Sequence, residues 1–405
     1  MESVDLVITH ASELLTLKGP QKPRVRQQMR NLGVLKDCSL AVHDGLIVDI
    51  GRNLRYQADT VIDAAGKLVM PGFVDPHTHV VFAGSREFEL NLKLAGVPYM
   101  EVLKRGGGIF YTVEKTRKAS PHQLLSQSKK RLDTMLRYGT TTCEAKTGYG
   151  LDVKNELKLL KVQRSLYETH PIDLVSTFLG AHAIPKEMDA EQYITSIIEE
   201  MLPKTQGLAQ FCDVFCEKGI FSIAQSKKIL LAGKRYGLQP KIHADEIVNT
   251  GGALLASKIG AISADHLLQS SDAGLRALAK NRIVGVLLPG TPFCLMMEHY
   301  APARKMIDGG VPVALATDLN PNCWTENMQM IIQLACLKMK MTPAEAIVAS
   351  TFNAACAIGM QQYIGSLEVG KHADIIILDC PNHQFLPYHF GVNLVQTVVK
   401  RGVVL

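Results

Sequence analysis

The chain has 405 residues, of which 47% are hydrophobic and 20% charged, so it can bury the core of one large domain plus a small one, or of two medium ones. The net charge of +6 comes from scattered lysines and arginines, which argues against nucleic acid as a partner. Nine cysteines at irregular spacing argue against a disulfide framework and for a reducing compartment. With no run of 18 apolar residues and no signal-like N-terminus, we expect a soluble cytoplasmic protein without a membrane span.

The sequence predicts β-strands at both ends of the chain. Residues 1–67 contain short strand-like runs and a hairpin signal, Asp44-Gly45, and strand-like runs return at 373–378 and 394–399. Neither end can bury a sheet face alone, so we predict one small β-sandwich domain formed by both termini, residues 1–67 and 360–405.

The middle of the chain, residues 68–359, alternates apolar runs with helix-like stretches. Continuous apolar runs are typical of parallel strands buried on both faces. There are eight such runs over roughly 270 residues, which is the size of a TIM-like (β/α)8 barrel. The runs are 68–74, 140–145, 174–179, 211–216, 240–242, 261–264, 283–288 and 311–316.

Polar side chains follow most of these runs. Active sites of such barrels lie at the carboxyl ends of the strands, so residues that end different runs are expected to meet there. A single one of them could be a satisfied core residue, but six runs end in this way. These ends are His77-Thr78-His79, Glu144 to Tyr149, His182, His243 to Glu246, Asp265-His266 and Asp318 to Asn320.

The minimal metal set is His77, His79, His243 and Asp318. Three neutral imidazoles and one carboxylate suit zinc or ferrous iron, on which the pKa of a bound water falls towards about 7. Glu246 lies three residues after His243 and can accept the proton of that water and pass it to a leaving nitrogen; the alternative is a first-turn residue of the next helix. His266 is a second candidate for polarising the substrate carbonyl or for transferring a proton.

These residues resemble the metal-dependent amidohydrolase superfamily. The likeness covers nearly the whole chain and includes Asn353-Ala354-Ala355 and Gly365 to Asp374 near the C-terminus. Many relatives bridge two metals with a carbamylated lysine on the fourth strand. Here the fourth run ends near Glu217 and Lys146 lies on the second run, which favours one divalent metal per subunit, zinc or iron.

Within that superfamily the chain is similar to the imidazolonepropionase family. The likeness is carried by motifs that are specific only in combination, namely residues 82–87, 106–109, 146–150, 178–185, 242–246 and 287–291. It implies hydrolysis of the cyclic amide 4-imidazolone-5-propanoate to N-formimidoyl-L-glutamate in histidine degradation. It also implies a homodimer.

The same resemblance implies roles for further residues. Arg86 would clamp the substrate carboxylate, with Tyr149 and His182 binding the carboxylate or the ring carbonyl. Tyr99 would close the pocket, and Asn320 would orient the substrate through its amide. The family pattern after Asn320 has glycine and serine or threonine, whereas this chain has Asn322, Cys323 and Trp324, so only backbone contacts to substrate are expected to survive there.

Two other functions stay open at this point. A deaminase of a cyclic amidine such as a nucleobase would share the metal set with Glu246, His266 and Asp318, but it needs no carboxylate clamp at Arg86. A metal-free scaffold would use the barrel for assembly only, and metal analysis separates it from both enzymes.

Overall fold

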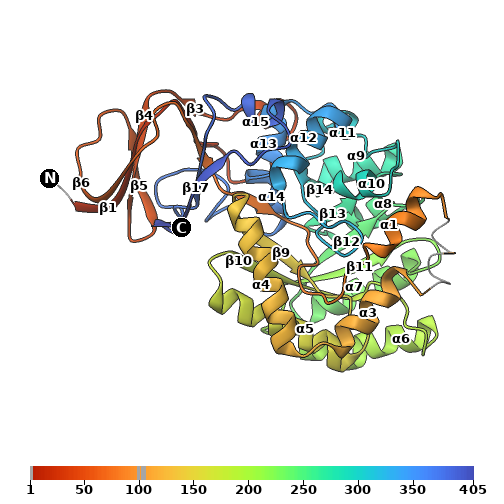
Figure 1. Ribbon diagram of the computed structural model, residues 1–405. Helices are drawn as coiled ribbons and strands as arrows, with labels where there is room; N and C mark the ends of the chain where they lie inside the picture. Colours follow the sequence, from red (N-terminus) through yellow and green to blue (C-terminus); the bar gives the residue numbers. More distant parts are fainter. Residues whose placement is uncertain (1–2, 98–100, 102–105) are drawn as a thin grey trace.

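The computed structural model describes residues 3–97, 101 and 106–405, and its largest unit is a sheet of eight parallel strands curled into a barrel (Figure 1). The strands follow one another in chain order around the sheet, as expected from the eight apolar runs. They are β8 (Phe73–Asp75), β9 (Thr140–Lys146), β10 (Asp173–Ala181), β11 (Phe211–Cys216), β12 (Gln239–Ala244), β13 (Ser263–His266), β14 (Val284–Leu287) and β15 (Val313–Leu315).

The barrel closes just beyond the last residues of β8 and β15. Thr78 and Leu319 form a parallel bridge, the His79 amide donates to the Leu319 carbonyl at 2.8 Å, and the Asp318 amide donates to the His77 carbonyl at 3.1 Å. The closing hydrogen bonds therefore run through the residues that the sequence marks as metal ligands. On the opposite wall His243 of β12 is in register with Asp265 of β13.

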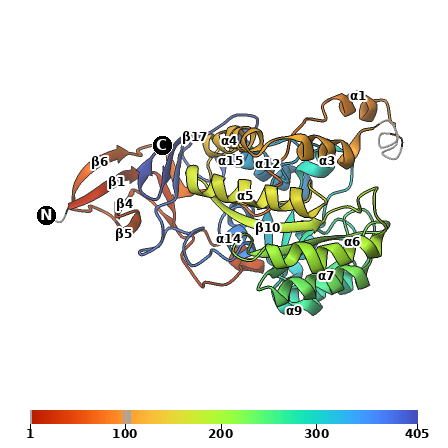
Figure 2. The same ribbon diagram turned by 90° about the horizontal axis from the view of Figure 1, so that it is seen from below.

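Helices cover the outside of the barrel (Figures 1 and 2). The helices expected from the sequence between the strands are confirmed, and Ser120, Asp152 and Ser222 cap three of them with their side chains. The helices outside the barrel are α3 (Gly108–Lys118), α4 (Pro121–Arg137), α5 (Val153–Thr169), α6 (Ala190–Ser196), α7 (Ile223–Arg235), α8 (Gly252–Ile259), α9 (Asp272–Asn281) and α11 (Ala303–Gly309). Short helices α1 (Phe88–Leu94) and α10 (Gly290–Cys294) lie in loops after β8 and β14, and the helical turns η2 (Ile197–Met201) and η3 (Leu202–Lys204) extend α6.

After β15 the chain adds three helices, α12 (Met328–Met339), α13 (Pro343–Ala349) and α14 (Phe352–Ala357). A reciprocal pair of hydrogen bonds caps the N-terminus of α13. The Glu345 amide donates to the Thr342 hydroxyl at 3.3 Å, and the Thr342 amide donates to Glu345 Oε2 at 2.8 Å. The Glu345 carboxylate also receives Arg30 at 2.9 Å and Arg304 at 2.7 Å, which fastens α13 to the N-terminal segment and to α11.

The two termini form separate sheets at one end of the molecule, where both chain ends lie (Figures 1 and 2). One sheet has four strands in the order β5 (Leu46–Gly51), β4 (Cys38–His43), β1 (Ser3–Ala11) and β6 (Gln57–Asp63), with β4 and β5 joined by the expected hairpin. The other has six strands in the order β18 (Val403–Val404), β17 (Val395–Lys400), β16 (Ile375–Leu378), β7 (Leu68–Pro71), β2 (Glu13–Leu15) and β3 (Val34–Leu35). The segment between β2 and β3 contains the helical turn η1 (Arg26–Arg30), and α15 (Phe385–Tyr388) precedes β17.

The first apolar run divides between two sheets, which the sequence did not reveal. Residues Leu68–Pro71 form β7 and pair with β16 and β2, and only Phe73–Asp75 belong to the barrel. Gly72 lies at the switch, where an added Cβ would come within 2.4 Å of the Thr141 side chain. The division of the chain into domains 1–67 with 360–405 and 68–359 stays a prediction, and β7 lies inside its second range although it pairs with strands of the terminal sheet. No helix in the described part of the chain is long and apolar enough to cross a membrane.

Candidate metal centre and active site

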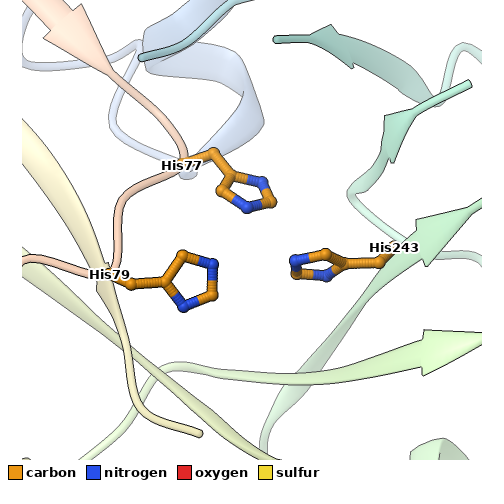
Figure 3. Close-up of side chains that lie close together, drawn as sticks. All are labelled: His77, His79 and His243. Carbon is orange, nitrogen blue, oxygen red and sulfur yellow. The ribbon is translucent and has the colours of Figure 1, made fainter. Parts of the chain in front are cut away.

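Three histidines face a common point at the carboxyl ends of the barrel strands (Figure 3). His77 and His79 follow β8, and His243 lies on β12 on the opposite wall. One ring nitrogen from each lies within 4.8 Å of those of the others, and all three side chains are buried. His77 Nε2, His79 Nδ1 and His243 Nε2 have no hydrogen-bond partner, which is costly for buried polar atoms unless another group satisfies them.

Asp318 completes this group from the end of β15. Its Oδ1 lies 3.6 Å from His77 Nε2 and 3.7 Å from His79 Nε2, and its Oδ2 accepts a hydrogen bond from the Thr291 hydroxyl of α10. Asp318 has φ of +53° and His266, at the end of β13, has φ of +74°. Such left-handed conformations are rare outside glycine, and here they occur where two strands end at the mouth.

Two buried carboxylates lie behind the histidines. Asp265 Oδ2 is 2.7 Å from His77 Nδ1, and Asp213 Oδ2 is 3.1 Å from His243 Nδ1, a charge contact rather than an aligned hydrogen bond. A carboxylate that holds the far nitrogen of an imidazole fixes its orientation and leaves the near nitrogen as an acceptor. The arrangement therefore presents the ring nitrogens of His77 and His243 towards the common point.

An ammonium group lies among these carboxylates. Lys146 Nζ, at the end of β9, is 2.7 Å from Asp213, 2.9 Å from Glu144 and 3.4 Å from Asp265. Burial alone would lower the pKa of Lys146, but the three carboxylates outweigh it and raise the pKa. Lys241 Nζ adds a second cation 2.6 Å from Glu144 Oε2, so the floor of the site is a buried network of paired charges.

The chemistry of these donors fits a divalent cation. Burial holds the pKa of both His77 and His79 well below the usual value, so their imidazoles are neutral and can donate lone pairs. Burial opposes charge on His243 too, but the Asp213 carboxylate outweighs it and raises that pKa. Three imidazoles and a carboxylate are a donor set that transition metals bind.

Glu246 and His266 lie beside the metal candidates. His266 Nδ1 is 3.6 Å from Glu246 Oε1, and the rings of His266 and His243 are 5.2 Å apart between centroids. Burial, and then the nearby Asp318 carboxylate, raise the pKa of Glu246 to about 8; burial likewise raises the pKa of Asp318 to about 6. A carboxyl whose pKa lies near neutrality can exchange a proton during turnover.

The neighbours of Glu246 have structural roles. Asp245 receives backbone amides at the start of α8, including those of Gly251 and Gly252 at 3.0 Å each. Glu217, which follows the fourth strand, accepts the Ile247 amide at 2.9 Å. Both carboxylates thus hold the loop that carries Glu246.

Tyr149 and His182 lie next to His79, as expected from their strand ends. The His182 ring stacks on the His79 ring at 4.9 Å between centroids, and the Tyr149 ring is 5.6 Å from that of His79. His182 Nδ1 contacts the Gly148 carbonyl at 3.1 Å, and burial lowers the pKa of His182 to about 3. A neutral His182 with its Nδ1 hydrogen donated to that carbonyl keeps Nε2 as an acceptor.

A cavity of about 750 Å³ opens nearby, between α1, α10 and the loop after β15. Arg86, Lys93 and Asn322 are among its polar side chains, with Glu87 also on the wall, and Phe293 and Trp324 are among its apolar ones. The Arg86 guanidinium already makes two 2.8 Å hydrogen bonds to Glu89, a pairing that the clamp predicted from the sequence did not include. Lys93 Nζ donates to Asn322 Oδ1 at 2.6 Å.

The turn after Asp318 differs from the expectation. The amides of Asn322 and Cys323 both donate to Asn320 Oδ1, at 2.7 and 3.1 Å, so the backbone donors reserved for substrate are engaged within the turn. Asn320 Nδ2 donates to the Asp318 carbonyl at 2.7 Å. The Cys323 side chain is fully buried, and Tyr99 lies outside the described residues.

Sequence reasoning missed the residues behind the histidines. The sequence places Asp265 at a strand end without a role and gives Asp213 none, although a charged residue inside an apolar run, as in Phe-Cys-Asp213-Val-Phe, signals a buried partner. The sequence predicts no role for Lys146, because it lies on the second strand and not on the fourth. Thr291 carried no signal, because its contact with Asp318 depends on α10.

Comparison with known proteins identifies the family. Two models described as "Amidohydrolase family" match residues 235–405 and residues 60–108. The imidazolonepropionase of Alkaliphilus oremlandii is 52% identical, with 100% of this chain and 98% of the relative covered, and that of Parabacteroides distasonis is 47% identical, with 99% of each covered. A zinc-bound adenosine deaminase structure from Xanthomonas campestris shares the fold, with a TM-score of 0.76 at 19% identity over 100% of this chain and 93% of that one. The chain belongs to the imidazolonepropionase family of the amidohydrolases.

Proposed function

We propose that this chain hydrolyses 4-imidazolone-5-propanoate to N-formimidoyl-L-glutamate, a step of histidine degradation. The observation that carries the proposal is the convergence of His77, His79, His243 and Asp318 on one buried point beside Glu246 and His266. The family name of relatives about half identical over the full chain supports the same reaction. Water adds to the ring carbonyl and the ring nitrogen leaves.

The four ligand candidates would hold one divalent cation, zinc or iron. When bound, such a cation polarises a carbonyl oxygen and lowers the pKa of a water ligand towards about 7. A single cation is supported by Lys146, whose ammonium group already neutralises the carboxylates behind His77 and His243.

Protein side chains move the protons. Glu246 accepts a proton from the attacking water and delivers it to the leaving ring nitrogen, which would otherwise depart as an unstable anion. His266, 3.6 Å from Glu246, donates a hydrogen bond to the carbonyl oxygen as negative charge develops there. Asp318 assists as a hydrogen-bond acceptor for the water.

Cationic side chains of the cavity would bind the propionate group. Arg86, which Glu89 holds in place, and Lys93 both line this cavity and carry the positive charge that a carboxylate needs. Tyr149 and His182 would contact the ring, with Asn320 and Asn322 shaping the wall that the ring faces. Cys323 would support that wall from behind, and Tyr99, which lies outside the described residues, would close the pocket as the family resemblance implies.

The reaction is tested with purified metal-loaded protein. We expect the ultraviolet absorbance of 4-imidazolone-5-propanoate to fall and mass spectrometry to detect N-formimidoyl-glutamate. Efficient deamination of cytosine or guanine without opening of the imidazolone ring would favour the deaminase alternative and overturn the proposal.

The carboxylate site is tested with an analogue in which an amide replaces the propionate. Arg86→Met should lower kcat/KM for the natural substrate by about 10- to 100-fold, the loss of one charge-assisted contact, and change that for the amide much less. Arg164→Met is the matched control, because Arg164 pairs with Glu168 on the outer helix α5 at 3.0 Å. Equal losses on both substrates would contradict the assignment.

The assembly and location also stay proposals. A homodimer rests on the family resemblance, and sedimentation velocity tests it. A cytoplasmic location is supported by nine free cysteines, which are typical of reducing compartments, and fractionation of cells tests it.

A further inference from the structure

Two cysteines from different segments meet beside the cavity. Cys294 ends α10 and Cys323 lies in the turn after β15, and their sulfur atoms are 3.8 Å apart. Cys294 is partly exposed and lines the cavity of about 750 Å³, whereas Cys323 is fully buried. A solvent-borne oxidant can therefore reach one thiol, and the second lies in contact behind it.

The two thiols differ in reactivity. The hydrogen bond between them, against the opposing effect of burial, lowers the pKa of the Cys294 thiol to about 7, and the Lys93 ammonium adds to this. The pKa of Cys323 is raised well above its usual value by the same hydrogen bond and by burial. An accessible thiol that ionises easily beside a protonated one is the arrangement of an attacking and a resolving cysteine.

Both segments hold the candidate metal ligand Asp318. The Thr291 hydroxyl, on the same short helix as Cys294, donates to the Asp318 carboxylate. Asn320, whose Oδ1 receives the Cys323 amide at 3.1 Å, donates to the Asp318 carbonyl at 2.7 Å. The Cys323 thiol also donates to the Thr317 carbonyl at 3.6 Å, next to Asp318 in the chain.

We propose that Cys294 and Cys323 form a reversible disulfide when the protein meets a peroxide, and that this bond disturbs Asp318 and slows turnover. The disulfide itself does not depend on the proposed function, whereas the effect on turnover rests on it. Bond formation must shorten the sulfur–sulfur distance from 3.8 Å to about 2.05 Å, so α10 and the turn move together or Cys323 leaves the Thr317 carbonyl.

The chemistry balances with hydrogen peroxide as the oxidant. The Cys294 thiolate attacks one peroxide oxygen, an S–O bond forms, the O–O bond breaks, and the departing hydroxide takes up a proton to become water. The sulfur of Cys323 then attacks the sulfenic acid, an S–S bond forms, and the hydroxyl leaves as a second water with the Cys323 proton. Two thiols lose two electrons to one peroxide, and a dithiol such as dithiothreitol returns them.

The test exposes the full metal-loaded chain to one equivalent of hydrogen peroxide, followed by digestion without reductant and mass spectrometry. We expect one linked peptide pair containing Cys294 and Cys323, with two fewer hydrogens than the free thiols, which dithiothreitol reverses. Cys336→Ser, which removes a half-buried thiol on α12, should still form the link. Cys294→Ser and Cys323→Ser should not form it.

Two measurements complete the test. Turnover of 4-imidazolone-5-propanoate by the parent and by Cys336→Ser should fall at least about 5-fold as the link forms and recover with dithiothreitol. Oxidation of Cys294 to sulfinic acid without a link, or a link that leaves turnover unchanged, would overturn the proposal. If the link forms as expected but neither redox state opens the imidazolone ring, the disulfide stands and the proposed function fails.

Discussion

The contact between Asp265 and His77 gives a sharp test of the metal centre. Asp265 Oδ2 lies 2.7 Å from His77 Nδ1, and Oδ1 receives the Ser263 hydroxyl at 2.7 Å, so the carboxylate is fixed on both sides. Asp265→Asn keeps the shape and removes the charge. If the new amide turns its NH2 group to His77, the imidazole must carry its proton on Nε2, the nitrogen that faces the metal position.

The size of the effect follows from this geometry. Loss of a carboxylate that orients a metal-binding histidine lowers metal affinity by about 10- to 100-fold, or about 1.4 to 2.7 kcal/mol. We expect the upper part of that range, because both residues are fully buried and water cannot replace the lost acceptor. The Lys146 ammonium, 3.4 Å from Asp265, loses one of three carboxylates, so a lower melting temperature is expected as well.

The assay is competition for zinc between metal-free protein and a chromophoric chelator, with circular dichroism to verify folding. Asp133→Asn is the matched control, because Asp133 lies 3.1 Å from His170 Nε2 on the outside of the barrel. Its zinc affinity should equal that of the parent. A folded Asp265→Asn protein that binds zinc within about twofold of the parent would refute the role given to Asp265.

Three further predictions concern proton transfer, the metal and pH. Glu246→Gln should lower kcat by about 10²- to 10⁴-fold with zinc still bound, measured as turnover against metal content; an unchanged kcat would remove Glu246 from the mechanism. Prolonged chelation should abolish turnover, and stoichiometric zinc or ferrous iron should restore it, whereas full activity of metal-free protein would contradict the site. Arg304 and Arg30, against the opposing effect of burial, lower the pKa of Glu345 to about 2, so this carboxylate stabilises the fold above about pH 4.5 and loses that contribution as the pH falls towards 2. Glu345→Gln should therefore cost about 2 to 3 kcal/mol at pH 7 and progressively less in acid by chemical denaturation, and a cost independent of pH would contradict the pairing.

The barrel and the residues at its mouth could be predicted from the sequence, because both follow from local sequence patterns. Each strand appears as a continuous apolar run, and the residue that ends a run must lie at the mouth whatever the exact register. Three strand ends share one rim of the barrel, which brings together His77 with His79, His243 and Asp318. The division of the run 68–74 could not be predicted, because its residues on both sides of Gly72 are apolar and only their pairing partners differ.

The buried charged residues behind the metal candidates could not be predicted from local sequence, for a different reason. Whether Asp213, Asp265 and Lys146 are paired depends on how far neighbouring parallel strands are staggered, and a shift of one residue would send each side chain to the other face of the sheet.

The pairing of Arg86 in the loop after β8 could not be predicted either. Its partner Glu89 is only three residues away, yet the pairing exists only once the loop after β8 turns into α1. The guanidinium predicted to clamp the substrate is thus held by Glu89 in advance, so the protein preorganises Arg86 before an anion arrives. That preorganisation implies a specific energetic signature: Glu89→Gln should weaken binding of the carboxylate substrate through a looser Arg86, even though it removes a negative charge beside Arg86. If charge alone governed recognition, the same substitution would tighten binding, and the sign of the change in KM distinguishes the two.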